Sequence, residues 1–103
     1  MLNYSGNNKH CEAVAKHYCA LFNNSDVSAI ISNDAEVGSS DQAKSLAEFY
    51  WFVLDETAKE RPKINQLSDS EIAYAVERLF HLIGGYLDRA GYGEIWEQVC
   101  DDA

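Results

Sequence analysis

The chain has 103 residues, of which 47% are hydrophobic and 12% aromatic, and this apolar content supports one core and excludes a chain that is disordered throughout. Its 17 acidic and 8 basic residues give a formal net charge of -9, which disfavours direct binding to nucleic acid or to an anionic membrane surface, because both require Lys and Arg to neutralise anions. We expect a single helical domain, residues 1–103, whose protein partners carry basic surfaces.

The first part of the chain contains two apolar periodicities that are typical of helices. Apolar residues recur at steps of three and four over residues 8–22, which predicts a helix capped by Asn7 or Asn8. The apolar residues of 27–31 have the same spacing and predict a short second helix, with a brief strand as the alternative.

A second long helix is predicted after the polar run of residues 33–40. Ser39 and Gln42 have the spacing of a capping box, in which the Ser side chain accepts the backbone N–H of the residue three positions later. The helix that begins there must end by Arg61, because Pro62 disfavours helical geometry in the residue before it.

The clearest helix follows a second capping-box spacing, Ser68 with Glu71, and its apolar series runs over residues 72–90. Gly84 and Gly85 fall inside this series, each at a cost of about 1 kcal/mol relative to Ala. We interpret them as a kink or a point of close packing, because the apolar register continues past them.

Residues 94–100 predict a short last helix after Gly91, since glycine suits the left-handed position that follows a helix end. No alternating strand pattern competes with these segments. The predicted fold class is therefore all-α: a small antiparallel helical bundle of three long helices plus one or two short ones.

The three cysteines, Cys11, Cys19 and Cys100, form an odd set without a close-spaced pair, and no signal-peptide pattern opens the sequence. No apolar run reaches the length of about 18 residues that a membrane-spanning helix needs. We therefore expect a cytoplasmic protein with free thiols and no membrane association.

Metal sites on helices need ligands at close spacing on one face, as in His-Glu-x-x-His. The chain has no such motif. The candidate pairs are seven and eight residues apart, too far to share one ion without an intervening ligand: His10 with His17, and Cys11 with Cys19. We expect no metal and no cofactor.

Glu77 and His81 are four residues apart on a predicted helix, a pairing that acid–base sites use and that also stabilises helices. No positioned nucleophile, phosphate-binding loop or second carboxylate accompanies them. We therefore expect a helix-stabilising pair, no catalytic residue and a protein that is not an enzyme.

The helix that begins after Ser39 carries aromatic residues beyond its core stripe. With the stripe centred on Tyr50, Phe49 and Trp51 lie about 100° to either side and Phe52 nearly opposite. Because aromatic side chains often dominate interface energies, we expect these three to contribute to a partner-binding patch or a homodimer seam. The alternative is that this helix is the central one of the bundle.

The acidic residues are concentrated toward the C-terminal end. Six of the nine net negative charges lie from Ile64 onward, and no basic residue follows Arg89. This surface could dock on a Lys- and Arg-lined groove, and the alternative is a solvated tail that only keeps the protein soluble. The candidate partner-binding acids are Glu94, Glu97, Asp101 and Asp102.

Three functional hypotheses follow. The first is a small inhibitor or neutraliser of a basic, nucleic-acid-handling target, such as a phage-encoded blocker of host defence or a bacterial immunity protein. The second is a dimeric structural adaptor or regulatory subunit. The third is a small-ligand binder or enzyme with a pocket among Tyr18, Tyr74, His81 and Tyr86.

Overall fold

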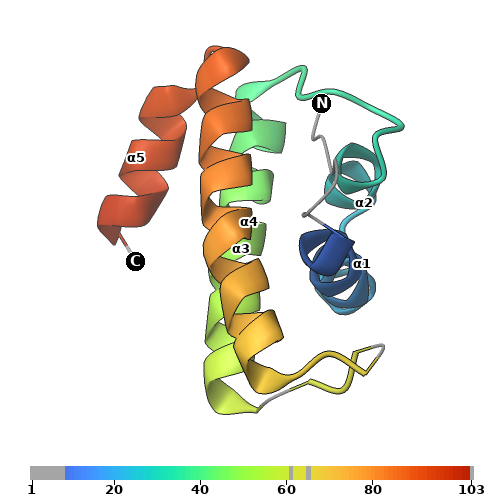
Figure 1. Ribbon diagram of the computed structural model, residues 1–103. Helices are drawn as coiled ribbons and strands as arrows, with labels where there is room; N and C mark the ends of the chain where they lie inside the picture. The colour runs from blue at the N-terminus through green and yellow to red at the C-terminus, as the bar shows by residue number, and fades with distance from the viewer. Residues whose placement is uncertain (1–8, 61, 65, 103) are drawn as a thin grey trace.

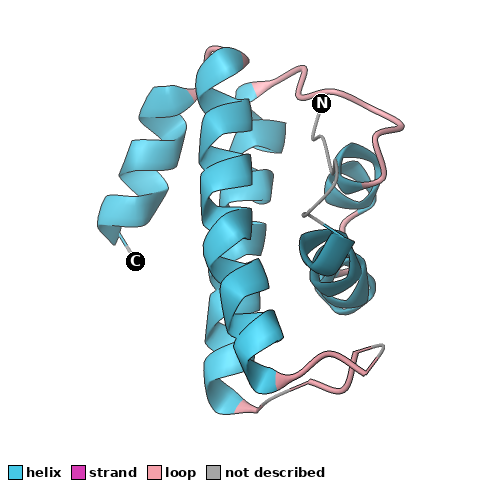
Figure 2. Cartoon of the chain, viewed as in Figure 1, coloured by secondary structure: helices cyan, strands magenta, loops and turns pink. Residues whose placement is uncertain are grey.

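The computed structural model describes residues 9–60, 62–64 and 66–102. This part of the chain consists of helices and loops and contains no strand (Figure 2), so the predicted all-α bundle is confirmed. The five helices are α1 (Lys9–Phe22), α2 (Ser25–Ile31), α3 (Ser40–Lys59), α4 (Asp69–Arg89) and α5 (Gly93–Asp102).

The two longest helices, α3 and α4, lie side by side and run in opposite directions (Figure 1). The aromatic rings of Tyr50 and Phe80 make contact across this pair, with centroids 5.3 Å apart. The shorter helix α5 lies along one side of the pair, and α1 and α2 lie on the other side. In the view of Figure 1, α1 and α2 are seen nearly end-on, so they cross α3 and α4 steeply.

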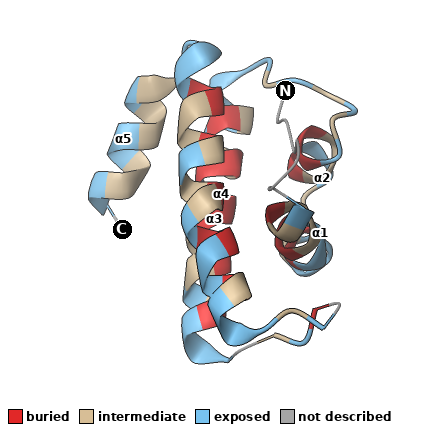
Figure 3. Cartoon of the chain, in the orientation of Figure 1, coloured by how far each residue is buried: buried red, intermediate tan, exposed pale blue. Residues whose placement is uncertain are grey.

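The core lies where α1 and α2 face α3 and α4 (Figure 3). Each of these four helices contributes fully buried apolar side chains, among them Val14, Ile30, Leu46 and Leu79. No residue of α5 is fully buried. This last helix is attached instead by the partly buried side chains Ile95, Trp96 and Val99.

The start of α2 removes the strand alternative for residues 27–31. Asn24 caps this helix, since its Oδ1 accepts a hydrogen bond from the Val27 N–H at 3.1 Å. The three apolar residues at steps of three and one, Val27, Ile30 and Ile31, are all buried on one face. The proposed caps of the first helix, Asn7 and Asn8, lie outside the described residues.

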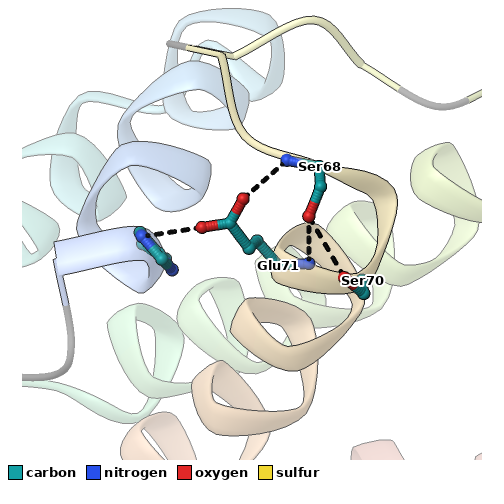
Figure 4. Close-up of polar contacts among 4 residues, drawn as sticks. Ser68, Ser70 and Glu71 are labelled. Atoms are coloured by element: carbon teal, nitrogen blue, oxygen red, sulfur yellow. Dashed lines mark hydrogen bonds and ion pairs between the residues drawn. The ribbon is translucent and has the colours of Figure 1, made fainter.

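The two predicted capping boxes have different outcomes. At the start of α4 both bonds are present: the Glu71 N–H donates to Ser68 Oγ at 3.2 Å, and the Ser68 N–H donates to Glu71 Oε1 at 2.9 Å (Figure 4). At the start of α3 the Gln42 N–H donates to Ser39 Oγ at 3.2 Å. The Gln42 side chain, however, accepts from the Gly38 N–H at 2.7 Å, one residue before the cap.

The turn after α4 positions α5. Gly91 has a φ of 90°, a left-handed conformation that glycine adopts at little cost. Around it the Tyr92 N–H donates to the Leu87 carbonyl at 2.8 Å and the Gly91 N–H to the Asp88 carbonyl at 3.1 Å, which is the Schellman pattern of a helix end. The chain reverses here, and α5 returns along α4 (Figure 1).

Candidate protein-binding surface

The outer face of α5 is an exposed row of carboxylates. Glu94, Glu97 and Asp101 are exposed and follow one another at steps of three and four, which places them on the same side of the helix. Asp102 is exposed beside them. The structure therefore brings the four acidic residues singled out in the sequence onto one short helix, which is held against α3 and α4.

This acidic face (Glu94, Glu97, Asp101 and Asp102) forms no ion pair within the described residues, although Lys44 of α3 lines a hollow together with Asp102. The ion pairs among the described residues are Lys16–Glu12, Lys59–Asp55 and His10–Glu71, and none includes an acid of α5. The helix has no basic residue in its last turn. Like charges three or four residues apart repel, and carboxylates at a helix C-terminus oppose the helix dipole. The arrangement therefore lowers the stability of the free protein.

The aromatic patch expected on α3 is not present as an exposed face. Phe49 is 0% exposed, because Phe22 of α1 covers it with ring centroids 5.5 Å apart. Phe52 is partly buried against the same Phe22 ring at 5.2 Å and against Tyr18 at 6.1 Å. Phe49 cannot contact a partner while the protein is folded in this way, so its assignment to a seam is wrong. It belongs to the core.

Trp51 is the aromatic residue that lies near the acidic face. It is partly buried and lines a hollow of about 350 Å³ between α3 and α5, together with Lys44, Glu48, Val99 and Asp102. We name this hollow the Trp51 hollow.

The thiol of Cys100 lies beside the Trp51 hollow, on α5. Burial raises the pKa of this thiol, and the neighbouring Trp51 N–H opposes that rise. The negative charge of Asp101 raises the thiol pKa further. Because a raised pKa disfavours the thiolate, Cys100 does not have the environment of a reactive nucleophile.

A second hollow, which the sequence analysis did not identify, lies between α3 and α4. Its volume is about 250 Å³, and it is lined by Leu54, Thr57, Ala58, Ala73 and Val76. Ala58 and Ala73 are exposed, and in the sequence they are indistinguishable from ordinary surface alanines of a helix. The available signal was helical spacing, since Ala58 follows the apolar Leu54 by four residues and Ala73 precedes the apolar Val76 by three. We name this hollow the α3–α4 groove.

The four residues considered for a ligand pocket are not brought together. Tyr18 lines one hollow with His17 and Glu56, whereas Tyr86 lines a separate one with Val37 and Arg89. The Tyr86 hydroxyl accepts a hydrogen bond from the Val37 N–H at 2.9 Å, which gives it a structural role. The other two, Tyr74 and His81, are exposed on α4 and line neither hollow.

The histidines and cysteines near the start of α1 make structural contacts. His10 Nε2 lies 3.4 Å from Glu71 Oε2, and the Cys11 Sγ donates to the Ala75 carbonyl at 3.4 Å. Within residues 9–60, 62–64 and 66–102, no group of three or more His, Cys, Asp or Glu side chains is arranged to hold a metal ion. None of the described helices combines the length and apolarity needed to cross a bilayer.

Comparison of the chain with models of known protein families, with curated proteins and with solved structures gave no match.

Proposed function

We propose that this chain is a small acidic protein-binding protein that inhibits or neutralises a basic, nucleic-acid-handling target by docking the acidic face of α5 on it. The observation that carries the proposal is the row of exposed carboxylates on one face of α5, Glu94, Glu97 and Asp101, with Asp102 exposed at the end of the helix and none of the four in an ion pair with a described residue. A phage-encoded blocker of host defence and a bacterial immunity protein are the two kinds of protein that fit this function.

Electrostatics gives the physical reason. A groove that binds phosphates is lined by Lys and Arg, and an acidic surface placed on it competes with nucleic acid for the same cations. Opposite charges also accelerate encounter between the two proteins. The self-repulsion within the acidic face is relieved only when basic groups approach, so part of the stability lost in the free protein is regained on binding.

The attachment of α5 favours docking over the role of a solvated tail. The Trp96 ring packs against Tyr50 and Phe80, with centroids 5.8 and 5.2 Å away, and Ile95 and Val99 pack against the core beside it. A tail that only increases solubility does not need its carboxylates at fixed positions. Carboxylates held by packing lose less conformational entropy on binding than those of a flexible segment.

The proposal involves no catalytic residue, metal or cofactor, and it places the protein in the cytoplasm. Two of its three free cysteines, Cys11 and Cys19, are buried, as in a protein that folds under reducing conditions. The alternative function, a dimeric adaptor, depended on Phe49, Trp51 and Phe52 forming a dimer seam. It loses support because Phe49 is buried in the core.

The test compares two charge-reversed variants with the same change in net charge. The first, Glu97→Lys with Asp101→Lys and Asp102→Lys, reverses the acidic face and leaves Glu94 in the first turn of α5, where a carboxylate is favourable. The control, Asp34→Lys with Glu36→Lys and Glu60→Lys, changes three exposed acids elsewhere.

Both variants and the unmodified protein are titrated against a panel of purified basic nucleases and nucleic-acid-binding proteins at low and high salt. We expect the unmodified protein to bind its target in a salt-sensitive way and to block nucleic-acid binding or cleavage by that target. The first variant should bind about tenfold more weakly or worse, whereas the affinity of the control should change by less than about threefold. Equal weakening by both variants would show that only net charge matters and that α5 is not the docking surface.

A further inference from the structure

The α3–α4 groove is the uncovered continuation of the site in which α5 itself lies. Trp96 of α5 packs over Tyr50 and Phe80. The groove begins one turn further along both helices, since Leu54 follows Tyr50 by four residues and Val76 precedes Phe80 by four. Helix α5 stops partway along the α3–α4 pair (Figure 1), and the residues that line the groove all belong to α3 and α4.

The lining of the groove is apolar except for Thr57, and the hydroxyl of Thr57 is already hydrogen-bonded. The Thr57 hydroxyl donates to the backbone carbonyls of Val53 and Leu54 in its own helix, at 2.9 and 3.0 Å. Thr57 therefore presents its methyl group. The remaining lining residues, Ala58 and Ala73 among them, are aliphatic. A surface of this kind is suited to apolar side chains rather than to a polar ligand.

The Trp51 hollow and the α3–α4 groove share one stripe of α3. Trp51, Leu54 and Ala58 follow one another at steps of three and four, so they lie on the same side of the helix. One apolar stripe thus passes the end of α5 and joins the two hollows. Residues at this spacing line the grooves into which the side chains of a second helix pack. A small residue such as Ala58 lets the two backbones approach closely.

The edge of this apolar stripe is acidic. Glu77 is exposed on α4 and directly follows Val76, a lining residue of the groove, in the sequence. Asp102 and Glu48 line the Trp51 hollow together with Lys44, so carboxylates outnumber cations there by two to one. Asp55, also on α3, is paired with Lys59 at 3.0 Å.

We propose that the stripe formed by Trp51, Leu54 and Ala58, with the groove beside it, binds an amphipathic α-helix of the partner protein, whose apolar face enters the groove and whose Lys and Arg residues face the surrounding carboxylates. The charge of the edge selects this occupant. A second copy of this chain is disfavoured, because it would bring another net charge of -9 against an acidic edge. The proposal rests on the proposed function, since it describes how the same basic partner makes additional contact.

The test uses two peptides of about 14 residues, or roughly 21 Å as a helix, made only of Leu and Lys in equal numbers. In the first the Leu residues form one helix face, and in the second the same residues are distributed around the helix. Binding of the fluorescently labelled peptides is measured by anisotropy. The variants are Ala73→Arg in the groove and Ala20→Arg as the matched control on α1; both positions are exposed in helices, where Arg is well tolerated.

We expect the amphipathic peptide to bind about tenfold more tightly than the redistributed one, with this advantage abolished by Ala73→Arg and unchanged by Ala20→Arg. Equal binding of the two peptides, or an unchanged advantage in Ala73→Arg, would overturn the groove proposal. If both peptides bind equally and the reversal of Glu97, Asp101 and Asp102 weakens both, the proposed function survives and the groove fails. The proposed function is decided separately by the titration against basic proteins, and it fails if the reversal of Glu97, Asp101 and Asp102 leaves that binding unchanged.

Sedimentation of the unmodified protein and of Ala73→Arg tests the remaining occupant. We expect both to sediment as monomers near 11.5 kDa. A dimer of the unmodified protein that Ala73→Arg dissociates would assign the groove to a second copy of the chain and overturn the proposal of a partner helix.

Discussion

The Trp96 ring of α5 lies directly against Gly84 of α4. A β-carbon at Gly84 would stand 2.7 Å from the Trp96 Nε1, closer than β-carbons approach other atoms, and 3.1 Å from its Cε2, which is also a tight contact. The ring packs in a cluster with Tyr50 and Phe80, so a shift away from Gly84 would disturb these aromatic contacts. At the adjacent Gly85 a β-carbon would meet only the flexible end of Arg89, at 3.2 Å. The close-packing interpretation of this glycine pair is therefore confirmed for Gly84.

The two glycines should respond oppositely to the same substitution. Gly85→Ala is expected to stabilise the protein by about 0.5–1 kcal/mol, because Ala has the higher helix propensity. For Gly84→Ala the overpacking cost of about 1–3 kcal/mol exceeds that gain, and a net loss of about 1 kcal/mol follows. Urea unfolding followed by circular dichroism measures both. Equal stabilisation by the two variants would show that Trp96 is not fixed on α4.

The capping box of α4 should make stability depend on pH. The Ser68 backbone N–H, together with the Ser68 hydroxyl, lowers the pKa of Glu71 below its ordinary value of 4.5. A carboxyl whose pKa is lower in the folded state stabilises the protein above the unfolded pKa, and this contribution is lost as the pH falls through the folded pKa. The relevant range therefore lies below about pH 4.5.

Glu71→Gln is the variant that isolates this effect, since glutamine keeps an acceptor for the Ser68 N–H and does not titrate. The unfolding free energy of the unmodified protein should exceed that of the variant at pH 7, and the difference should shrink as the solution is acidified below pH 4.5. A difference that stays constant over this range would mean that Glu71 is not stabilised by its charge.

The three thiols should differ in reactivity toward a disulfide reagent such as DTNB. Cys11 and Cys19 are buried, and burial raises the pKa of both thiols, that of Cys19 to about 11. Cys100 is only partly buried. We expect Cys100 to react first, and Cys11 and Cys19 to react only at the rate of global unfolding. Cys100→Ser should remove the early phase alone; an early phase that persists would locate opening within α1.

Reversing charges on α5 should separate stability from binding. In Glu97→Lys with Asp101→Lys and Asp102→Lys, the last turn gains basic residues that complement the helix dipole, and a gain of about 0.5–1 kcal/mol in total is expected. The same variant is predicted to lose its partner. Greater stability together with weaker binding would indicate that the acids are kept for function, whereas a loss of stability would indicate a structural role for them.

The positions of the helices and most of their ends follow from the sequence, because they depend on contacts between residues close along the chain. The Ser68–Glu71 box and the left-handed Gly91 were predicted correctly, since a cap involves groups only a few positions apart. The last helix is longer than predicted, Gly93–Asp102 against 94–100, because the end of a helix is weakly marked when no cap residue stands there.

The sides of α3 that are covered depend instead on how the helices pack against one another. Periodicity placed Phe49, Trp51 and Phe52 at different angles around the helix, but the angle of a residue does not say whether a neighbouring helix lies there. Phe22 of α1 covers Phe49 and Phe52, whereas Trp51 lies at the edge of α5 and lines an open hollow. Because contacts between helices join residues that are distant in the chain, local spacing could not reveal them.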